Sequence, residues 1–156
     1  DIALTVLASV IGHNHQRKRI IIDAGSLALS KDKSANKFMP EAGYGLICNP
    51  HTAIPFEGLN ISEIHQEHGS IKIKSIDWFD KLPIGSQVRI LPNHACLTCA
   101  AYENYNILEN GSKGNLFLVK PFLISKFDCR IQIRESNWDL ETCRIFPYRI
   151  VCPALI

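Results

Sequence analysis

Two residues with metal-binding side chains, His94 and Cys96, follow a strand-like run and a proline at residues 87–92. An imidazole and a thiolate are both common zinc ligands. Because side chains two positions apart point to the same side of an extended segment, both donors could converge on one ion. Structural zinc usually takes four protein ligands, so two donors imply either distant partners or an open site completed by water or substrate. The open arrangement would be catalytic.

Cys96 and Cys99 also have the C-x-x-C spacing of a redox pair. Redox chemistry of that kind needs a βαβ setting, which the flanking sequence does not indicate. The chain has no recognisable signal segment, so its six cysteines are expected to be reduced thiols of a cytoplasmic protein. Cys99 is then most simply a small buried side chain in a helix that follows the two donors.

A second pair of histidines, His13 and His15, has the H-x-H spacing of a metal site. The pair lies in a turn between two strand-like runs, beside the three cations Arg17, Lys18 and Arg19. Because these cations would repel a metal ion, a solvated hairpin tip is the favoured interpretation.

Glu67 and His68 precede Gly69, and they could form an acid–base pair or simply close a tight turn before the next strand. Both interpretations stay open, and these two residues are the weak catalytic candidates of the chain. Asp23 and Asp32 lie in turn-like segments, where Asp side chains commonly accept hydrogen bonds from nearby backbone N–H groups. Local capping is therefore favoured over catalysis for both.

The elements that must position these residues are mostly strands. A short helix of one or two turns is expected after Cys96, and Asn110-Gly111 predicts a hairpin turn. Together these elements indicate a mainly β fold, barrel-like or Greek-key, with one or two short helices. Apolar or alternating runs predict the strands at residues 1–11, 19–23, 43–47, 59–65, 70–76, 87–91 and 105–108, the first two joined as a hairpin.

Length and charge narrow the class of protein. The 156 residues, 46% of them apolar, suffice for one domain with an appendage, and a net charge of +2 gives no sign of a nucleic-acid or membrane partner. Residues 1–115 carry eleven charges of each sign, whereas residues 116–156 carry six cations, four anions and three of the cysteines. We therefore expect a β-domain at 1–115 and a divergent extension at 116–156 that adds strands near 116–119 and 129–134.

Five stretches occur in the order found in one enzyme family: residues 4–12, 22–32, 44–45, 66–69 and 90–98. On these stretches the chain resembles the C-terminal domain of the D-serine dehydratase and D-threonine aldolase family, over residues 1 to about 112. Members of that family are pyridoxal-phosphate (PLP) enzymes of the alanine-racemase fold type. The resemblance implies a β-rich domain that packs against a PLP-carrying (β/α)₈ barrel, often across a dimer.

The resemblance also implies a role for the first pair of residues. In the family an H-x-C or H-x-D pair after the proline holds a metal, so the carry-over falls on His94 and Cys96. H-x-C resembles the zinc-dependent dehydratase branch, because thiolate and imidazole suit zinc whereas a carboxylate suits a harder ion such as manganese. Zinc would act on the β-hydroxyl of a small D-amino acid and PLP would acidify its α-carbon, giving a keto acid and ammonia.

The PLP lysine and its barrel are absent from these 156 residues, and the chain starts in a strand without a Met. We therefore expect a missing upstream part and no lyase activity from this chain alone. Three alternatives remain: a catalytically inactive β-domain that acts as a dimerisation or interaction module, a D-threonine-aldolase-like domain, and a redox protein that uses Cys96 and Cys99.

Overall fold

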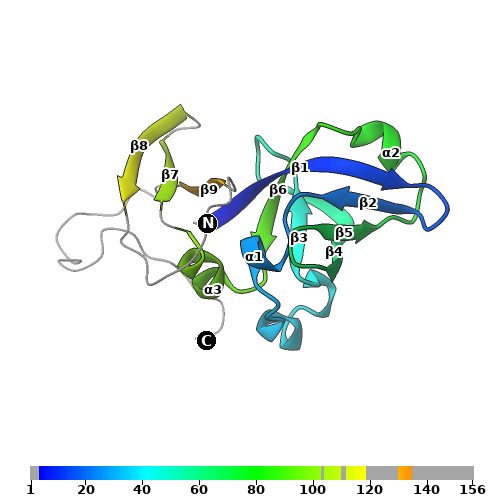
Figure 1. Cartoon of the computed structure of the whole chain (residues 1–156), viewed down its shortest axis with the longest axis horizontal. Helices are drawn as coiled ribbons and strands as arrows, with labels where there is room; N and C mark the ends of the chain where they lie inside the picture. Colours follow the sequence, from blue (N-terminus) through cyan, green and yellow to red (C-terminus); the bar gives the residue numbers. More distant parts are fainter. Residues whose placement is uncertain (1–3, 103, 110–111, 119–129, 135–156) are drawn as a thin grey trace.

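The computed structural model describes residues 4–102, 104–109, 112–118 and 130–134. Nine strands form one connected sheet in the order β2-β5-β4-β3-β6-β1-β9-β7-β8 (Figure 1). An additional pairing of β2 with β1 closes the first six strands of this order into a barrel. The expected mainly β, barrel-like fold is confirmed.

The barrel strands pair antiparallel throughout. Strand β1 pairs with β6 through residues 6–9 and with β2 from Val10 onwards, with an irregularity between Val10 and Gly12. Irregularities of this kind bend a strand and help a barrel to close. The six barrel strands are β1 (Leu4–Asn14), β2 (Arg19–Ile22), β3 (Gly45–Cys48), β4 (Pro55–Ile64), β5 (Gly69–Lys72) and β6 (Gln87–Pro92).

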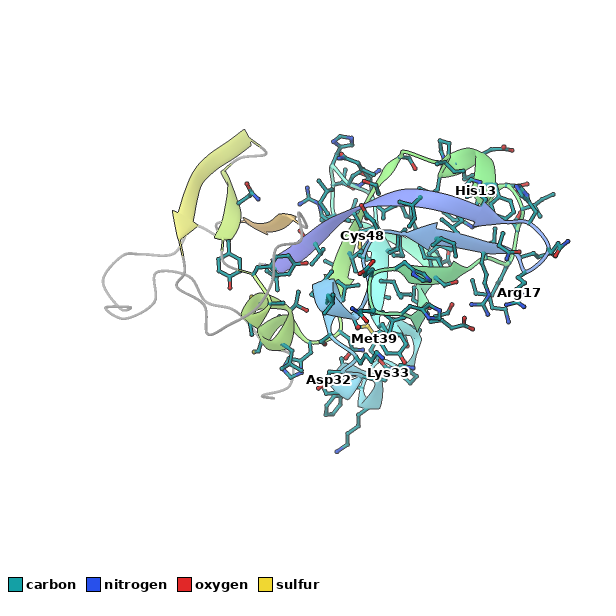
Figure 2. The ribbon with its side chains drawn as sticks, in the orientation of Figure 1. His13, Arg17, Asp32, Lys33, Met39 and Cys48 are labelled. Carbon is teal, nitrogen blue, oxygen red and sulfur yellow. The ribbon has the colours of Figure 1, made fainter. Side chains whose placement is uncertain are left out.

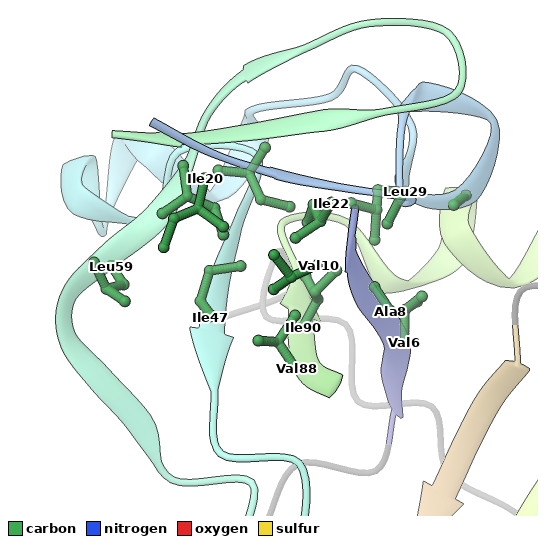
Figure 3. Packing of buried hydrophobic residues seen from close by; sticks show 14 of the residues in the cluster. Val6, Ala8, Val10, Ile20, Ile22, Leu29, Ile47, Leu59, Val88 and Ile90 are labelled. Carbon is green, nitrogen blue, oxygen red and sulfur yellow. The ribbon is translucent and has the colours of Figure 1, made fainter. Parts of the chain in front are cut away.

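Alternating apolar residues fill the barrel. Val6, Ala8 and Val10 of β1 are at most 4% exposed, and the residues between them face outward or are only partly buried. This period of two is the pattern of a strand with one buried face. Neighbouring strands contribute Ile20, Ile22, Ile47, Leu59, Val88 and Ile90 to the same core (Figure 3).

Three further strands extend the sheet beyond β1: β7 (Asn104–Glu109), β8 (Ser112–Leu118) and β9 (Arg130–Arg134). Strands β7 and β8 form the expected antiparallel hairpin, although its Asn110-Gly111 turn lies outside the described residues. Strand β9 pairs antiparallel with residues 4–7 of β1 and parallel with β7. The three strands lie to one side of the barrel in Figure 1.

The helices are short and lie between strands. The described residues contain three α-helices, α1 (Ser26–Leu29), α2 (Trp78–Lys81) and α3 (Ala95–Ala100), one more than expected, and two 3-10 turns, η1 (Ser34–Lys37) and η2 (Pro40–Ala42). No helix in this part of the chain is both long and apolar enough to cross a membrane.

Side-chain hydrogen bonds hold α3 against α1. The Thr98 hydroxyl is buried and donates to the carbonyl of Leu29 at 3.0 Å, and the Tyr102 hydroxyl donates to that of Ala28 at 3.0 Å. The segment that carries Asp32 and Lys33 lies away from the β1–β2 hairpin tip, which His13 and Arg17 mark in Figure 2. The Asp32 segment and the hairpin tip that carries His13 therefore belong to different parts of the molecule.

Candidate metal site

His94 lies at the junction between β6 and α3. Its backbone is extended, with φ −132° and ψ 97°, and its carbonyl accepts the Thr98 N–H at 3.1 Å, which closes the first turn of the helix. Cys96 is therefore in the helix and not in an extended segment with His94, so the predicted extended geometry of the pair is wrong. The strand-to-helix junction itself was expected, because good helix formers follow Cys96.

The two candidate donors differ in exposure. Cys96 is exposed, whereas the His94 side chain is 21% exposed. Within the described part of the chain, no group of three or more His, Cys, Asp or Glu residues could hold a metal ion. A closed structural zinc site needs about four protein ligands, so the described residues fit only an open site.

The nearest polar partner of His94 is Asp32. The Asp32 Oδ2 lies 3.0 Å from His94 Nδ1, and the hydroxyl of Ser34 lies 3.5 Å from the same nitrogen. Asp32 also accepts a hydrogen bond from the Ser34 backbone N–H. That N–H above all, followed by the Ser34 side chain and His94, holds the pKa of Asp32 below its usual range.

Local capping by Asp32, which the sequence indicated, is thus confirmed, and a second contact was missed. Asp32 and His94 are separated by 62 positions in the chain, so no local spacing pattern could reveal that they meet. The signal available in the sequence was that Asp32 and His94 lie in two stretches, 22–32 and 90–98, that resemble the same family.

Asn93 ties the Asp32 loop to the end of β6. Its side chain is 5% exposed. Its Oδ1 accepts the Ala35 N–H at 3.0 Å, and its Nδ2 donates to the Asn36 side chain and to the Gly43 carbonyl at 2.8 Å. The residue before His94 therefore fixes the loop that carries the carboxylate facing His94.

Glu67 and His68 lie in the exposed turn between β4 and β5. The backbone of this turn accepts hydrogen bonds from α1: Ser26 N–H donates to the His65 carbonyl at 2.8 Å and Leu27 N–H to that of Gln66 at 3.1 Å. The rings of His65 and His68 stack at 4.4 Å. The structure therefore fits the tight-turn interpretation, because the turn accepts hydrogen bonds from α1. The catalytic interpretation stays untested.

His13 and His15 pack on α2. Their rings lie 4.7 and 4.3 Å from the ring of Phe79, which is 7% exposed, and His13 Nε2 is 2.8 Å from the Leu82 carbonyl oxygen. The expected hairpin is present, and its tip is exposed at His15 while His13 is half-buried. Apolar contact with Phe79 explains the pair without a metal.

Cys48 and Cys99 are buried free thiols, whereas Cys96 is exposed. Burial raises the pKa of Cys99 to about 11 and that of Cys48 to about 11. Since a redox cysteine reacts as a thiolate, a buried Cys99 with a raised pKa does not suit the redox alternative.

Iodoacetamide at pH 8 should therefore modify Cys96 and leave Cys48 and Cys99 unmodified until the protein unfolds. Of these three thiols, Cys96 is exposed and the other two are buried. Peptide mass spectrometry after timed labelling, with a urea-unfolded sample as the control, measures this order. Labelling of Cys99 at the rate of Cys96 in the folded protein would contradict it.

The chain is similar to known dehydratases. A family model described as "Putative serine dehydratase domain" matches residues 3–108. D-threo-3-hydroxyaspartate dehydratase of Delftia sp. is 37% identical over 112 residues, covering 69% of this chain and 29% of that protein. D-serine dehydratase of Dictyostelium discoideum is 33% identical over 117 residues, covering 72% and 28%. The chain thus spans less than a third of the length of these two relatives.

Solved structures agree with this result. The structure of the Delftia dehydratase matches with a TM-score of 0.68 and 32% identity, covering 76% of this chain and 32% of that one. Two further matching structures are alanine variants of a D-threo-3-hydroxyaspartate dehydratase, one at a histidine and one, in the metal-free form, at a cysteine two positions later. An uncharacterized protein of Mycobacterium tuberculosis, 28% identical over 118 residues, is covered over 77% of its length.

The barrel, its short helices and these matches define a β-domain of the alanine-racemase-like dehydratase type. The chain belongs to the D-serine dehydratase family and corresponds to its C-terminal domain. The Delftia and Dictyostelium relatives are dehydratases, so the comparison does not favour the interaction-module or aldolase alternatives.

Proposed function

We propose that this chain is the metal-binding β-domain of a D-serine-dehydratase-like lyase and that His94 and Cys96 are its zinc ligands. The observation that carries the proposal is the pairing of a partly exposed imidazole with an exposed thiol two residues later, at the point where β6 meets α3. In a D-threo-3-hydroxyaspartate dehydratase, a histidine and a cysteine with the same spacing have been replaced, and the structure of the cysteine variant is of the metal-free form.

The donor set fits zinc. An imidazole with a thiolate is a borderline-soft donor pair, and such a pair suits zinc better than it suits manganese or magnesium. With two protein donors, zinc keeps positions for water or a substrate oxygen, as in catalytic sites. An aldolase-type carboxylate is absent from position 96, which supports the dehydratase branch of the family.

The chain's own residues would orient the metal ligands. Asn93 fixes the backbone before His94, and the Thr98 backbone N–H donates to the His94 carbonyl at 3.1 Å, so the ligand segment is held from both sides. When bound, zinc would supply Lewis-acid activation of the β-hydroxyl of a D-hydroxy amino acid, in a reaction whose α-carbon chemistry belongs to PLP.

The complete enzyme would need further parts. We infer that a PLP-binding (β/α)₈ barrel, on the same protein or on a homodimer partner, supplies the cofactor lysine and most of the substrate pocket. The overall reaction is β-elimination of D-serine or a related D-hydroxy amino acid to a keto acid and ammonia, in the cytoplasm. This chain alone would bind metal without turning over substrate.

Zinc stoichiometry tests the proposal. The chain should bind one zinc ion, and His94→Ala or Cys96→Ser should abolish binding in a chelator-competition titration, because each removes one of two protein ligands. His51→Ala, which removes another exposed imidazole, and Cys99→Ala, which removes the neighbouring thiol, are matched controls that should keep the zinc.

Two results would contradict the assignment of His94 and Cys96 as zinc ligands. A wild-type chain that binds no zinc, or zinc binding that survives both His94→Ala and Cys96→Ser, would contradict the assignment. The lyase part has its own test: formation of keto acid from D-serine or D-threo-3-hydroxyaspartate by the chain combined with the PLP barrel of a relative. If His94→Ala left keto acid formation in this assay unchanged, the proposed role of His94 in the lyase reaction would be overturned.

A further inference from the structure

We propose that Asp32 is a positioning residue for His94: its carboxylate keeps the imidazole proton on Nδ1, so that the lone pair of Nε2 is directed to the metal. The proposal rests on the proposed function, because it assumes that His94 is a zinc ligand. It adds a residue that lies 62 positions away in the chain and touches the imidazole only through Nδ1.

The chemistry of the contact determines which nitrogen carries the proton. An ionised carboxylate is only an acceptor, so at 3.0 Å from Asp32 Oδ2 the His94 Nδ1 must be the donor. A neutral imidazole has one N–H, so Nε2 is then left with a free lone pair. An ordinary Asp carboxyl group is already ionised at neutral pH.

Asp32 orients His94 and does not itself ligate. The two ring nitrogens point in different directions, so a carboxylate bonded to Nδ1 faces away from an ion bound to Nε2. The described residues indeed contain no cluster of three possible ligands, although Asp32, His94 and Cys96 are close in the fold or the sequence. Carboxylates bonded to a metal-binding histidine in this way fix its tautomer and ring orientation and raise its basicity.

The carboxylate is itself held in place. The Ser34 N–H donates to Asp32 Oδ1, and the Asp32 N–H donates to the Ser30 hydroxyl at 3.3 Å. Asn93 then anchors the next two residues of the loop through the Ala35 N–H and the Asn36 side chain. A chain of hydrogen bonds therefore connects the residue before His94 to the carboxylate that orients it, which is the support that a preorganised site requires.

The first arm of the test needs no metal. Long-range ¹H–¹⁵N NMR of the metal-free chain, at alkaline pH where imidazole is neutral, should show His94 with its proton on Nδ1. In Asp32→Ala the Nδ1–H form should lose its dominance, while the His51 signals in the same spectra should not change. An Nε2–H tautomer in the wild type, or an unchanged His94 tautomer in Asp32→Ala, would overturn the proposal.

The second arm measures zinc affinity by chelator competition. Asp32→Ala should weaken binding by about 10-fold to 100-fold. Asp32→Asn, which keeps an uncharged acceptor, should give a smaller loss. Asp77→Ala, which removes an exposed carboxylate that makes no capping hydrogen bond, should match the wild type. Equal affinity of Asp32→Ala and wild type would overturn the proposal.

The two arms separate this inference from the proposed function. If the wild type binds no zinc, His94 is not a ligand, and the metal-free NMR arm still decides whether Asp32 sets its tautomer. Urea unfolding of each variant, followed by circular dichroism, shows that a loss of affinity is measured on folded protein. Asp32→Glu supplies a rescue: a restored Nδ1–H tautomer with restored affinity supports positioning by the carboxylate, and neither restored contradicts it.

Discussion

Replacing Gly25 by alanine is expected to lower the free energy of unfolding by about 3 kcal/mol, the upper end of the usual cost of overpacking. A Cβ at this position would lie 2.5 Å from the backbone nitrogen of His68 and closer still to the carbonyl oxygen of Gln66. Both atoms belong to backbone, so no side chain can rotate away. The two packed stretches, 22–32 and 66–69, would have to separate.

Gly12→Ala is the matched control for this effect. Its Cβ would meet only the Ile21 side chain at 3.9 Å, which is an ordinary van der Waals contact. Urea unfolding followed by far-UV circular dichroism should therefore show a large loss for Gly25→Ala and a small change for Gly12→Ala. Equal midpoints for the two variants would show that the turn at 66–68 can relax and that close packing at Gly25 is not required.

Replacing Asn93 by alanine is expected to cost about 2 to 3 kcal/mol of unfolding free energy and to weaken zinc binding as well. The side chain is buried, and its loss leaves the Ala35 N–H and the Gly43 carbonyl without their partner. Leaving these partly buried polar groups unpaired is more costly than losing an exposed hydrogen bond. The Asp32 loop would also lose its attachment beside His94.

Asn14→Ala provides the comparison for Asn93. Asn14 makes an exposed hydrogen bond to the Arg17 N–H at 2.9 Å in the hairpin tip, away from the candidate site. Its loss should cost less than about 1 kcal/mol and leave zinc affinity unchanged. If Asn93→Ala lost stability but kept full zinc affinity, the loop would be positioned without Asn93.

Local sequence patterns predicted the strands well, because their information is local. Apolar runs predicted strands at residues 1–11 and 87–91, where the structure has β1 and β6. Side chains that alternate between the core and the outside then place Val6, Val88 and Ile90 in the core. The β7–β8 hairpin followed from its turn residues. The predicted strand at 70–76 is too long, since β5 ends at Lys72.

The features that the sequence did not reveal depend on contacts between distant segments. The β1–β2 hairpin was predicted, but the barrel also needs the pairing of β2 with β5, which no single segment encodes. The contact of Asp32 with His94 depends on the path of the loop over the end of β6. Cys96 was placed in an extended segment because the start of α3 at Ala95 was expected one or two residues later.

Because β1 is paired on both edges, its amides should be protected from hydrogen exchange. Along residues 6–7, β1 is hydrogen-bonded to β6 on one edge and to β9 on the other, and further along it pairs with β2. A strand bonded on both edges cannot detach by fraying, so its amides should exchange with solvent only in the largest unfolding events. Since β6 pairs with β1 through residues 87–90 and ends at Pro92, the candidate metal site lies next to a ladder whose amides should be among the last of the described residues to exchange.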